Sequence, residues 1–471
     1  LGNRDDVTVY GTNINLSDIN MLAINPFSFP SKTIHVLEHM ERLIEIFNAC
    51  WPMYAAMPAV LKEAIERAYI FAGWDLEYSI NKYDNELFPD FNDVLREIKT
   101  VIDRSEYSAD NKGDYTGALV TRIRALTNGI NGQIFKSDSL YDSAIFDQNV
   151  IIDLSRVGSM ETKSLIMGLL ILKLQEYRMD AGERNAKLRH ITVLEEAHNL
   201  LRKTSVEQIS EGANLRGKSV EMIANAIAEM RTYGEGFIIA DQAPGLLDLS
   251  VIRNTNTKII LKLPDYSDRE LVGKASGLSE SQIDEISKLE TGVAVISQSG
   301  WIEPVLCKVE KFEEKFENKI KSEGDKTSKH NIDLEEFLLK LVKREKYHID
   351  KIDSSELREC ILRSKLSTNI KCRFFEYIQS DNENRIKKFG SLIFDFSNAD
   401  KAIEKARKYD NIKTWTNCVK DSLDLNMKEC SNQQINLILA LIINEQVDRD
   451  SEYIDILCRF TEIYKRERRV L

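Results

Sequence analysis

The stretch His190-Ile-Thr-Val-Leu-Glu-Glu-Ala-His198 determines how the rest of the chain is interpreted. Residues 191–194 are all apolar or β-branched, which is typical of a strand buried in a parallel sheet. Two adjacent carboxylates, Glu195 and Glu196, follow this strand at its C-terminal end. Ligands of open α/β sheets bind at the carboxyl ends of the strands, so these glutamates are candidates for chemistry.

The two carboxylates suit a reaction at a phosphate. Glu195 can hold the water shell of a Mg²⁺ ion. Glu196 can position and polarise the water that attacks a phosphoryl group. The alternative is that the strand is followed by a solvent-exposed helix whose first turn contains the two glutamates. Negative charges at a helix N-terminus are favourable because they interact with the helix dipole. The strand pattern alone leaves both interpretations open.

Downstream of residue 149 the hydrophobic pattern alternates between strands and helices. Strands are predicted at 150–154, 191–194, 237–240 and 258–263, and helices at 162–178 and 219–233. This alternation predicts an α/β fold, with a parallel sheet covered by helices on both faces. The segments 292–296 and 305–309 are predicted to form a closing hairpin or edge pair.

The flanking segments differ in pattern. Residues 1–30 predict two short strands, and 31–148 predict helices, the first of them capped by Ser31. Residues 311–330 are rich in Lys, Glu, Ser and Gly and predict a charged linker. Residues 331–471 have helical periodicity throughout, with 435–443 the most apolar helix.

Composition excludes several classes of protein. Seven scattered cysteines without a Cys-x-x-Cys pair argue against a zinc ribbon or a disulfide framework, and favour reduced thiols in the cytoplasm. No apolar run is long enough for a membrane span. The net charge of −11 argues against a surface that coats DNA. It is compatible with a few basic residues from each subunit converging inside a ring.

One string imitates a phosphate-binding loop. Gly212-Ala-Asn-Leu-Arg-Gly-Lys218-Ser219 fits the Walker A pattern G-x-x-x-x-G-K-S. A genuine loop of this kind follows an apolar strand directly. The preceding residues, 205–211, are polar, so we interpret the match as accidental.

Several short motifs in a fixed order resemble the HerA-like ATPases, hexameric DNA-translocating motors of the RecA-like P-loop class that are related to FtsK. The resemblance covers about two-thirds of the chain. The motifs are Ala23-Ile-Asn-Pro-Phe27, Ile46-Phe-Asn-Ala-Cys-Trp-Pro-Met-Tyr54, Val150-Ile-Ile-Asp-Leu-Ser155, Val193-Leu-Glu-Glu-Ala-His-Asn-Leu200, Ala228-Glu-Met-Arg-Thr-Tyr-Gly234, Ile238-Ile-Ala-Asp-Gln-Ala-Pro244, Asn254-Thr-Asn-Thr-Lys-Ile-Ile260 and Gly300-Trp301.

The resemblance implies a RecA-like P-loop ATPase core that uses ATP and Mg²⁺. Residues 1–30 would supply its N-terminal strands and 149–310 its main part with the Walker B strand. A helical bundle, 31–148, would be inserted between them, and the linker would lead to an all-helical domain, 331–471. The family's phosphate loop is then expected upstream of Leu1.

The resemblance also implies roles for individual residues. Glu195 would hold Mg²⁺ through water, and Glu196 would activate the attacking water. Gln242 would sense the γ-phosphate, and the alternative is an exposed residue at the end of a strand. Arg231 would reach the nucleotide of a neighbouring subunit, with Arg216 as second choice, although a cation at a helix C-terminus is favourable in itself. Basic residues near the loop after the acidic strand would face a pore or merely solvent: Arg202, Lys203, Arg216 and Lys218.

These implications predict an ATP-hydrolysing subunit of a homohexameric ring that translocates or remodels double-stranded DNA. The expected partner is a nuclease or an NAD-degrading effector, and the divergent helical tail favours antiphage defence. The alternative is a non-hydrolysing ring scaffold that organises and activates an effector, against which the glutamate pair argues. A third interpretation, a monomeric small-molecule kinase, requires the Gly212–Ser219 string to be real.

Overall fold

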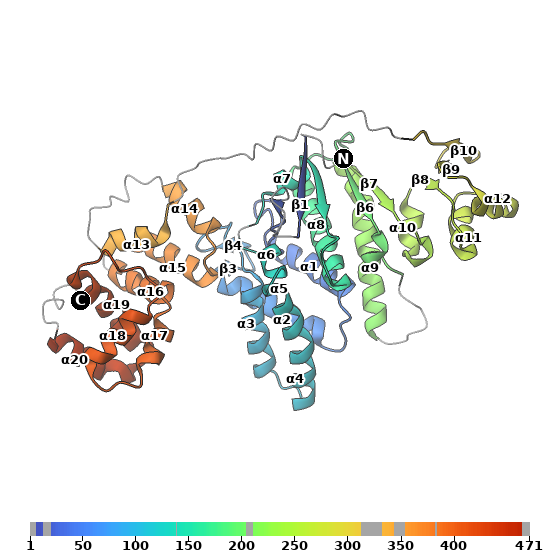
Figure 1. The fold of residues 1–471 in the computed structure, drawn as a ribbon. Coiled ribbons are helices and arrows are strands. Elements are labelled where there is room, and N and C mark those ends of the chain that lie inside the picture. The colour runs from blue at the N-terminus through green and yellow to red at the C-terminus, as the bar shows by residue number, and fades with distance from the viewer. Residues whose placement is uncertain are drawn as a thin grey trace. The chain divides into compact units, whose positions relative to one another are not determined.

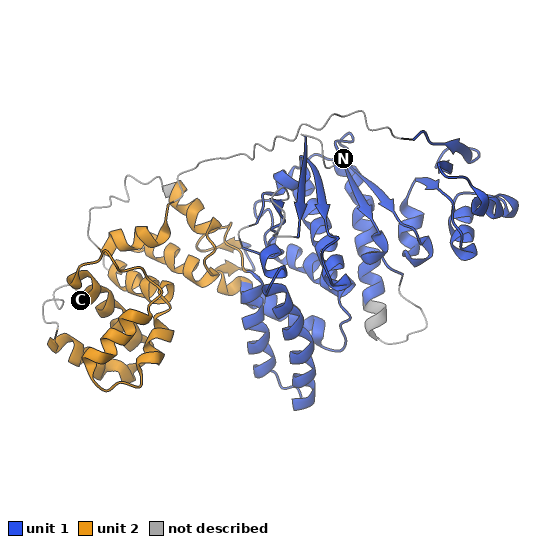
Figure 2. Ribbon diagram, in the orientation of Figure 1, with its two compact units in different colours: residues 1–68, 76–79, 90–323 blue, residues 69–75, 80–89, 324–471 orange. Residues whose placement is uncertain are grey.

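The computed structural model describes residues 6–12, 20–137, 139–203, 211–311, 332–342, 354–381 and 384–463. The chain forms two compact units (Figure 2). Unit 1 comprises residues 1–68, 76–79 and 90–323, and unit 2 comprises 69–75, 80–89 and 324–471. Figure 1 shows the order of their elements along the chain.

Unit 1 contains two sets of parallel strands. Strand β1 (Val7–Gly11) lies between β2 (Asn20–Met21) and β5 (Asn149–Asp153), and both neighbours run parallel to it. Strand β6 (His190–Glu195) pairs in parallel with β7 (Glu235–Ala240). The predicted mixed α/β class with parallel strands is therefore confirmed.

The third set of strands in unit 1 is antiparallel. Strand β8 (Thr257–Ile260) pairs with β9 (Val293–Gln298), which pairs with β10 (Val305–Lys308). The predicted hairpin of the last two strands is confirmed. The prediction that β8 continues the parallel sheet is wrong for the described residues, because β8 packs with β9 around a small core of its own. That core contains Ile260, Ile286 and Val295.

The apolar side chains of Ile191, Val193 and Ile238 are exposed on β6 and β7, so the prediction that helices cover both faces of these strands is wrong for the described residues. Helices lie beside the strands of unit 1 (Figure 1). They are α1 (Val36–Cys50), α2 (Met57–Phe71), which continues into unit 2, α3 (Phe91–Arg104), α4 (Ala109–Tyr115), η1 (Thr116–Val120), α5 (Thr121–Thr127), α6 (Asn131–Ile134), α7 (Asp142–Phe146), α8 (Met160–Asp180), η2 (Ala197–Asn199), α9 (Glu211–Glu229), η3 (Met230–Tyr233), η4 (Pro244–Leu246), α10 (Leu249–Asn254), α11 (Tyr266–Ala275), α12 (Glu280–Glu285) and η5 (Ile286–Lys288).

Helix α1 packs against α8 and α9 and begins later than its sequence suggests. Ser31 does not cap it, because residues 30–34 close a turn in which Ile34 N–H donates to the Pro30 carbonyl at 3.0 Å. The cap is His35, whose Nδ1 accepts from Leu37 N–H at 3.3 Å. A Cβ at Gly168 would lie 2.8 Å from the Ile46 side chain, so glycine there permits the close approach of α8 to α1.

The structure groups the chain differently from the five predicted segments. Residues 31–68, 76–79 and 90–148 of the predicted helical insertion lie in unit 1 with the strands. Residues 69–75 and 80–89 of the same segment belong to unit 2, where β3 (Trp74–Asp75) and β4 (Ile80–Asn81) form a hairpin. The predicted linker, apart from Lys311, lies outside the described residues. The boundaries of the five segments stay predictions.

The C-terminal part of unit 2 is helical over its described residues, as predicted. Its longest helix, α19, begins with a capping box between Ser431 and Gln434 and buries residues 438–443. The helices are α13 (Leu334–Val342), α14 (Ser354–Arg363), α15 (Thr368–Gln379), α16 (Arg385–Phe396), α17 (Ala399–Ala406), α18 (Ile412–Ser422), α19 (Asn432–Arg449), η7 (Ser451–Tyr453) and α20 (Ile454–Ile463).

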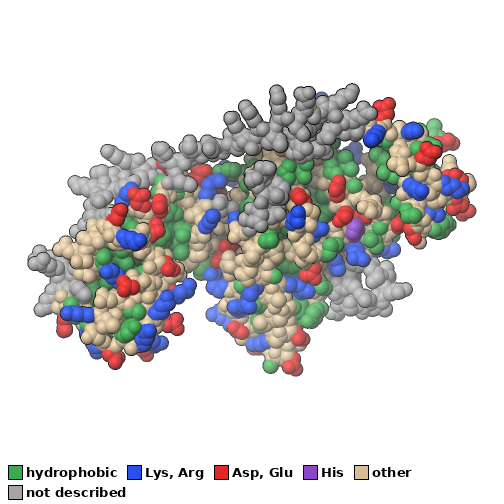
Figure 3. All heavy atoms as spheres, viewed as in Figure 1, with side chains coloured by type: hydrophobic (Ala, Val, Ile, Leu, Met, Phe, Trp, Pro, Cys, Tyr) green, Lys and Arg blue, Asp and Glu red, His purple; other side chains and the backbone are tan. Residues whose placement is uncertain are grey.

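Two further features bear on the function. Across the described helices, none has both the length and the apolar character that crossing a membrane requires. On the face shown in Figure 3, basic and acidic side chains are intermingled over both units. The described part of this face therefore carries no broad basic patch of the kind that coats DNA.

Candidate functional site

The predicted acidic residues lie at one edge of the β6–β7 pair. Glu195 stands opposite Ala240 in the parallel register, so the residues that follow the two strands emerge at the same carboxyl edge. Glu195, Glu196 and Gln242 are all exposed there. The structure thus brings to one sheet edge the two carboxylates and the amide for which chemistry was predicted.

Glu196 has an unusual backbone conformation. Its φ of 49° and ψ of 47° lie in the left-handed region, which residues other than glycine rarely adopt. Asn199 supports this turn by donating its backbone N–H to the Glu196 carbonyl at 2.9 Å and its side-chain amide to Glu196 Oε2 at 3.4 Å. Strain of this kind gathers at functional sites because the surroundings must hold it in place.

Asp241, which sequence reasoning did not select, organises the same edge. Its side chain is only 3% exposed. Its Oδ2 accepts from the His198 backbone N–H at 2.9 Å and lies 2.9 Å from His198 Nδ1. Its Oδ1 accepts from Ala243 N–H at 3.0 Å. The rule that selected the glutamates, a carboxylate directly after an apolar strand, would have found it.

The segments that follow β6 and β7 are joined further along as well. Lys203 N–H donates to the Leu246 carbonyl at 2.8 Å, and Asp248 N–H donates to the Leu201 carbonyl at 2.9 Å. Arg202 and Leu247 form an antiparallel bridge between them. These contacts fix the two segments relative to each other. Residues 204–210, the rest of the loop for which a pore-facing role was considered, lie outside the described residues.

The string that imitates a phosphate loop is helical. Residues 212–219 lie within α9, so their N–H groups point along a helix and do not form a cradle. Ser219, which would bind Mg²⁺ in a genuine loop, is fully buried and donates to Glu45 at 2.5 Å. Our interpretation of this string as an accidental match is confirmed, and the kinase interpretation that depended on it fails.

The two candidate arginines lie elsewhere. Arg216 Nε donates to the Ala49 carbonyl at the end of α1, at 3.0 Å. Arg231 is exposed in η3, a few residues before β7 begins. Since β7 has six residues and a strand rises about 3.3 Å per residue, Arg231 lies about 20 Å from the carboxyl edge. Within one chain, Arg231 therefore does not reach Glu195 or Glu196.

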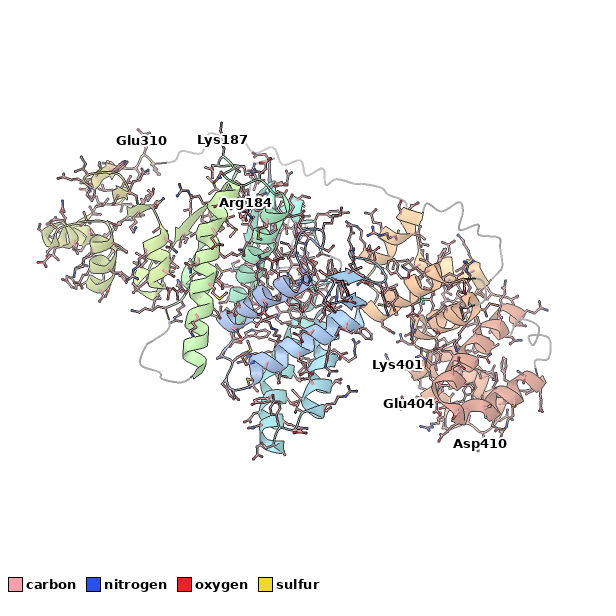
Figure 4. The ribbon with its side chains drawn as sticks, turned by 180° about the vertical axis from the view of Figure 1, so that it is seen from behind. Arg184, Lys187, Glu310, Lys401, Glu404 and Asp410 are labelled. Carbon is pink, nitrogen blue, oxygen red and sulfur yellow. The ribbon has the colours of Figure 1, made fainter. Side chains whose placement is uncertain are left out.

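The amino edge around Arg231 is basic and closely packed. Ala186 N–H donates to the Thr232 carbonyl at 3.2 Å, which places the segment before β6 beside η3. A Cβ at Gly234, where φ is +79°, would lie 2.4 Å from the Lys187 carbonyl oxygen, so this junction requires glycine. Arg184 and Lys187, labelled in Figure 4, are exposed on the same segment.

A buried ion cluster anchors this amino edge. The Glu235 side chain is fully buried, and it receives Arg178 Nε at 3.1 Å and Thr192 Oγ1 at 2.8 Å. His190 Nδ1 lies 2.6 Å from Glu235 Oε1. Burial alone would raise the pKa of Glu235, but the hydrogen bonds from His190 and Thr192 and the nearby charges outweigh it, and its pKa is lowered. The cluster joins α8 to both strands.

The carboxyl edge carries carboxylate and amide oxygens, and oxygen atoms are the ligands that Mg²⁺ prefers. Among the described residues, no group of three or more His, Cys, Asp or Glu side chains is arranged to hold a metal ion unaided. A Mg²⁺ ion here would therefore take most of its ligands from phosphate oxygens and water, with Glu195 contacting the water shell. The residues present fit that mode of binding.

Comparison with known proteins found no matching family model. The chain is similar to the DNA double-strand break repair helicase HerA of Sulfurisphaera tokodaii, with 26% identity over 235 residues, 49% of this chain and 45% of that protein. It is also similar to the HerA helicase of Sulfolobus acidocaldarius, with 38% identity over 127 residues, 27% of this chain and 24% of that protein. The chain thus spans less than half the length of these relatives.

Two solved structures are also similar to the chain. VirB4 of Thermoanaerobacter pseudethanolicus has a TM-score of 0.44 at 13% identity, covering 65% of this chain and 82% of that one. The bacterial conjugative coupling protein TrwB has a TM-score of 0.42 at 10% identity, covering 68% and 76%. The sequence similarity to the two HerA helicases agrees with the resemblance inferred from the motifs of the chain.

Proposed function

We propose that this chain is a subunit of an ATP-hydrolysing ring that translocates or remodels double-stranded DNA. The observation that carries the proposal is the shared carboxyl edge of β6 and β7, where Glu195, Glu196 and Gln242 stand exposed. The distant similarity to DNA double-strand break repair helicases supports it independently.

Each residue at this edge has a defined task in the proposal. ATP with Mg²⁺ supplies the phosphoryl group and the charge that neutralises it. Glu195 orients the water shell of the ion, and Glu196 polarises the attacking water. Gln242 contacts the γ-phosphate from the adjacent strand. The turn at Glu196 and its contact with Asn199 hold the carboxylate in one orientation before the nucleotide arrives.

The proposed ring follows from the position of the arginine. Arg231 is exposed about 20 Å from the glutamates of its own chain, in the estimate from strand length above. A head-to-tail interface would bring it to the carboxyl edge of a neighbour, and such interfaces close into rings. Arg216, the second choice, is already held by the Ala49 carbonyl. We therefore assign the intersubunit role to Arg231 in a homohexamer.

The proposed partner is a nuclease or an NAD-degrading effector, in antiphage defence in the cytoplasm. Unit 2 has its own hydrophobic cores and contributes none of the predicted site residues, which suits a docking role. All seven cysteines are free, as in a reducing compartment.

The test is ATP hydrolysis by the full-length protein with and without double-stranded DNA, together with the mass of the assembly. We expect a ring whose hydrolysis is stimulated by DNA. A protein that remains monomeric with nucleotide and DNA present would contradict the proposal. A ring that binds ATP and activates an effector without hydrolysis would support the scaffold instead.

A further inference from the structure

The Asp241 carboxylate joins the turns that follow β6 and β7. Both of its oxygens are used, since Oδ2 contacts the backbone N–H and Nδ1 of His198 and Oδ1 accepts from Ala243 N–H. The side chain is 3% exposed, so these donors do not compete with bulk water. An ionised carboxylate only accepts hydrogen bonds, and it therefore selects the His198 tautomer with hydrogen on Nδ1.

His198 is in turn close to the strained residue of the site. It is the middle residue of η2, which begins directly after Glu196. The turn is closed by Asn199 N–H on the Glu196 carbonyl, and Ser164 Oγ donates to the Asn199 carbonyl. A movement of His198 would change the backbone angles of Glu196, because one residue separates them. Gln242 directly follows Asp241 in the chain.

We propose that His198 and Asp241 form a positioning pair that holds Glu196 and Gln242 in a fixed relation. This inference rests on the proposed function of the site. The water that Glu196 polarises must face the phosphate that Gln242 contacts, and the two residues follow different strands. A charge-assisted contact between the two turns restricts their motion relative to each other, and it thereby holds Glu196 and Gln242 at a fixed separation.

The competing role for His198 is proton transfer to substrate. Two amide substitutions separate the roles. In His198→Asn the side-chain nitrogen stands where Nδ1 stood and can still donate to Asp241. In His198→Gln the nitrogen stands where Nε2 stood, and the contact with Asp241 is lost. Neither amide titrates, so a proton-transfer role predicts that both variants fail equally.

The experiment measures kcat for ATP hydrolysis and, separately, the Kd for ATP in the full-length protein. We expect His198→Gln and Asp241→Ala to lower kcat by about 10–100-fold, as loss of a residue that orients a site residue does. The Kd for ATP should change little, and His198→Asn should retain most of the rate. If His198→Gln turns over like the wild type, or His198→Asn is as slow as His198→Gln, the positioning pair is wrong.

A second measurement does not depend on hydrolysis. The backbone N–H groups of His198 and Ala243 both donate to Asp241. In Asp241→Ala their hydrogen exchange should accelerate together relative to other amides of unit 1, and unchanged exchange at both positions would overturn the pair. A wild-type protein that hydrolyses no ATP would overturn the proposed function, while the exchange result would still decide whether the pair exists.

Discussion

Arg178 Nε donates to Glu235 at 3.1 Å, and the side chains are only 4% and 0% exposed. The same guanidinium contacts Asp147 at 2.8 Å through Nη1 and the Phe146 carbonyl at 2.5 Å through Nη2. This pair therefore ties α8 to the first residue of β7 and to the turn before β5. Because the carboxyl edge with its glutamates is built on the same strands, the pair supports the site from the opposite end.

Replacing Glu235 should destabilise unit 1. Glu235→Gln removes the buried carboxylate beside Arg178 and leaves the partly exposed Asp147 as its charged partner. Breaking a buried pair costs about 3–5 kcal/mol when the remaining charge has no other partner, so the contact with Asp147 should keep the cost below that range. The matched control is Glu183→Gln, since Glu183 pairs with Arg189 on the surface and its side chain is 70% exposed. Loss of such an exposed pair costs about 0–1 kcal/mol. Denaturant unfolding of both variants checks the difference, and equal effects would contradict it.

The same cluster predicts a dependence of stability on pH. The pKa of Glu235 is lower in the folded protein than its ordinary value of 4.5. The ionised Glu235 therefore makes its full contribution to the free energy of unfolding at pH values above its ordinary pKa. This contribution is lost as the pH falls through the folded-state pKa. The free energy of unfolding of the wild type should fall over this acidic range. The difference between wild type and Glu235→Gln should shrink in the same range, and a constant difference would show that Glu235 is not responsible.

Glu196→Gln should bind ATP and fail to hydrolyse it. Glutamine preserves the shape of the side chain and can still accept from Asn199, but it lacks the charge that polarises water. A loss of about 10²–10⁴-fold in kcat is expected for removal of a base. Glu195→Gln should instead weaken Mg²⁺-dependent binding. The control is Glu290→Gln, an exposed glutamate between η5 and β9. Normal turnover by Glu196→Gln would rule out its assigned role.

Lys218→Ala should leave ATP binding largely intact. Lys218 is exposed on α9, and alanine is the strongest helix former, so the helix should persist. A phosphate-loop lysine would lose its charge contact with the β- and γ-phosphates instead. Ser219→Ala provides a second check, because loss of its buried hydrogen bond to Glu45 should cost about 1 kcal/mol of stability and no ATP affinity. Abolished ATP binding in Lys218→Ala would contradict the helical assignment.

The sequence predicted the parts of the site that depend on local pattern. The strand before Glu195 follows from the short run of apolar and β-branched residues, and it is present. The contact of His198 with Asp241 joins residues that are 43 positions apart and depends on the register of two strands, which periodicity does not specify. The pairing of β8 with β9 likewise depends on how α11 and α12, which connect the two strands, direct the chain back to β8. The start of α1 depends on the turn that Ile34 N–H closes with the Pro30 carbonyl.

Arg231→Ala should abolish hydrolysis while ATP binding persists. A guanidinium that contacts transition-state charge contributes about 10³–10⁵ in rate in other phosphoryl-transfer systems. The matched control is Arg253→Ala, an exposed arginine in the last turn of α10. If Arg231→Ala hydrolyses ATP normally, its assigned role is wrong and Arg216 becomes the next candidate, although its contact with Ala49 would first have to break.

The position of Arg231 also predicts that its effect acts between subunits. Since η3 precedes β7 and Glu195 lies at the other end of the strands, the proposed ring would supply the arginine of each ATP site from another chain. Mixing inactive Arg231→Ala with inactive Glu196→Gln and allowing subunit exchange creates some interfaces with an intact glutamate site and an intact arginine. Part of the hydrolysis should return in the mixture and in neither protein alone. Verified exchange without any return of activity would contradict donation by a neighbouring subunit, because Glu196 and Arg231 would then have to act within the same chain.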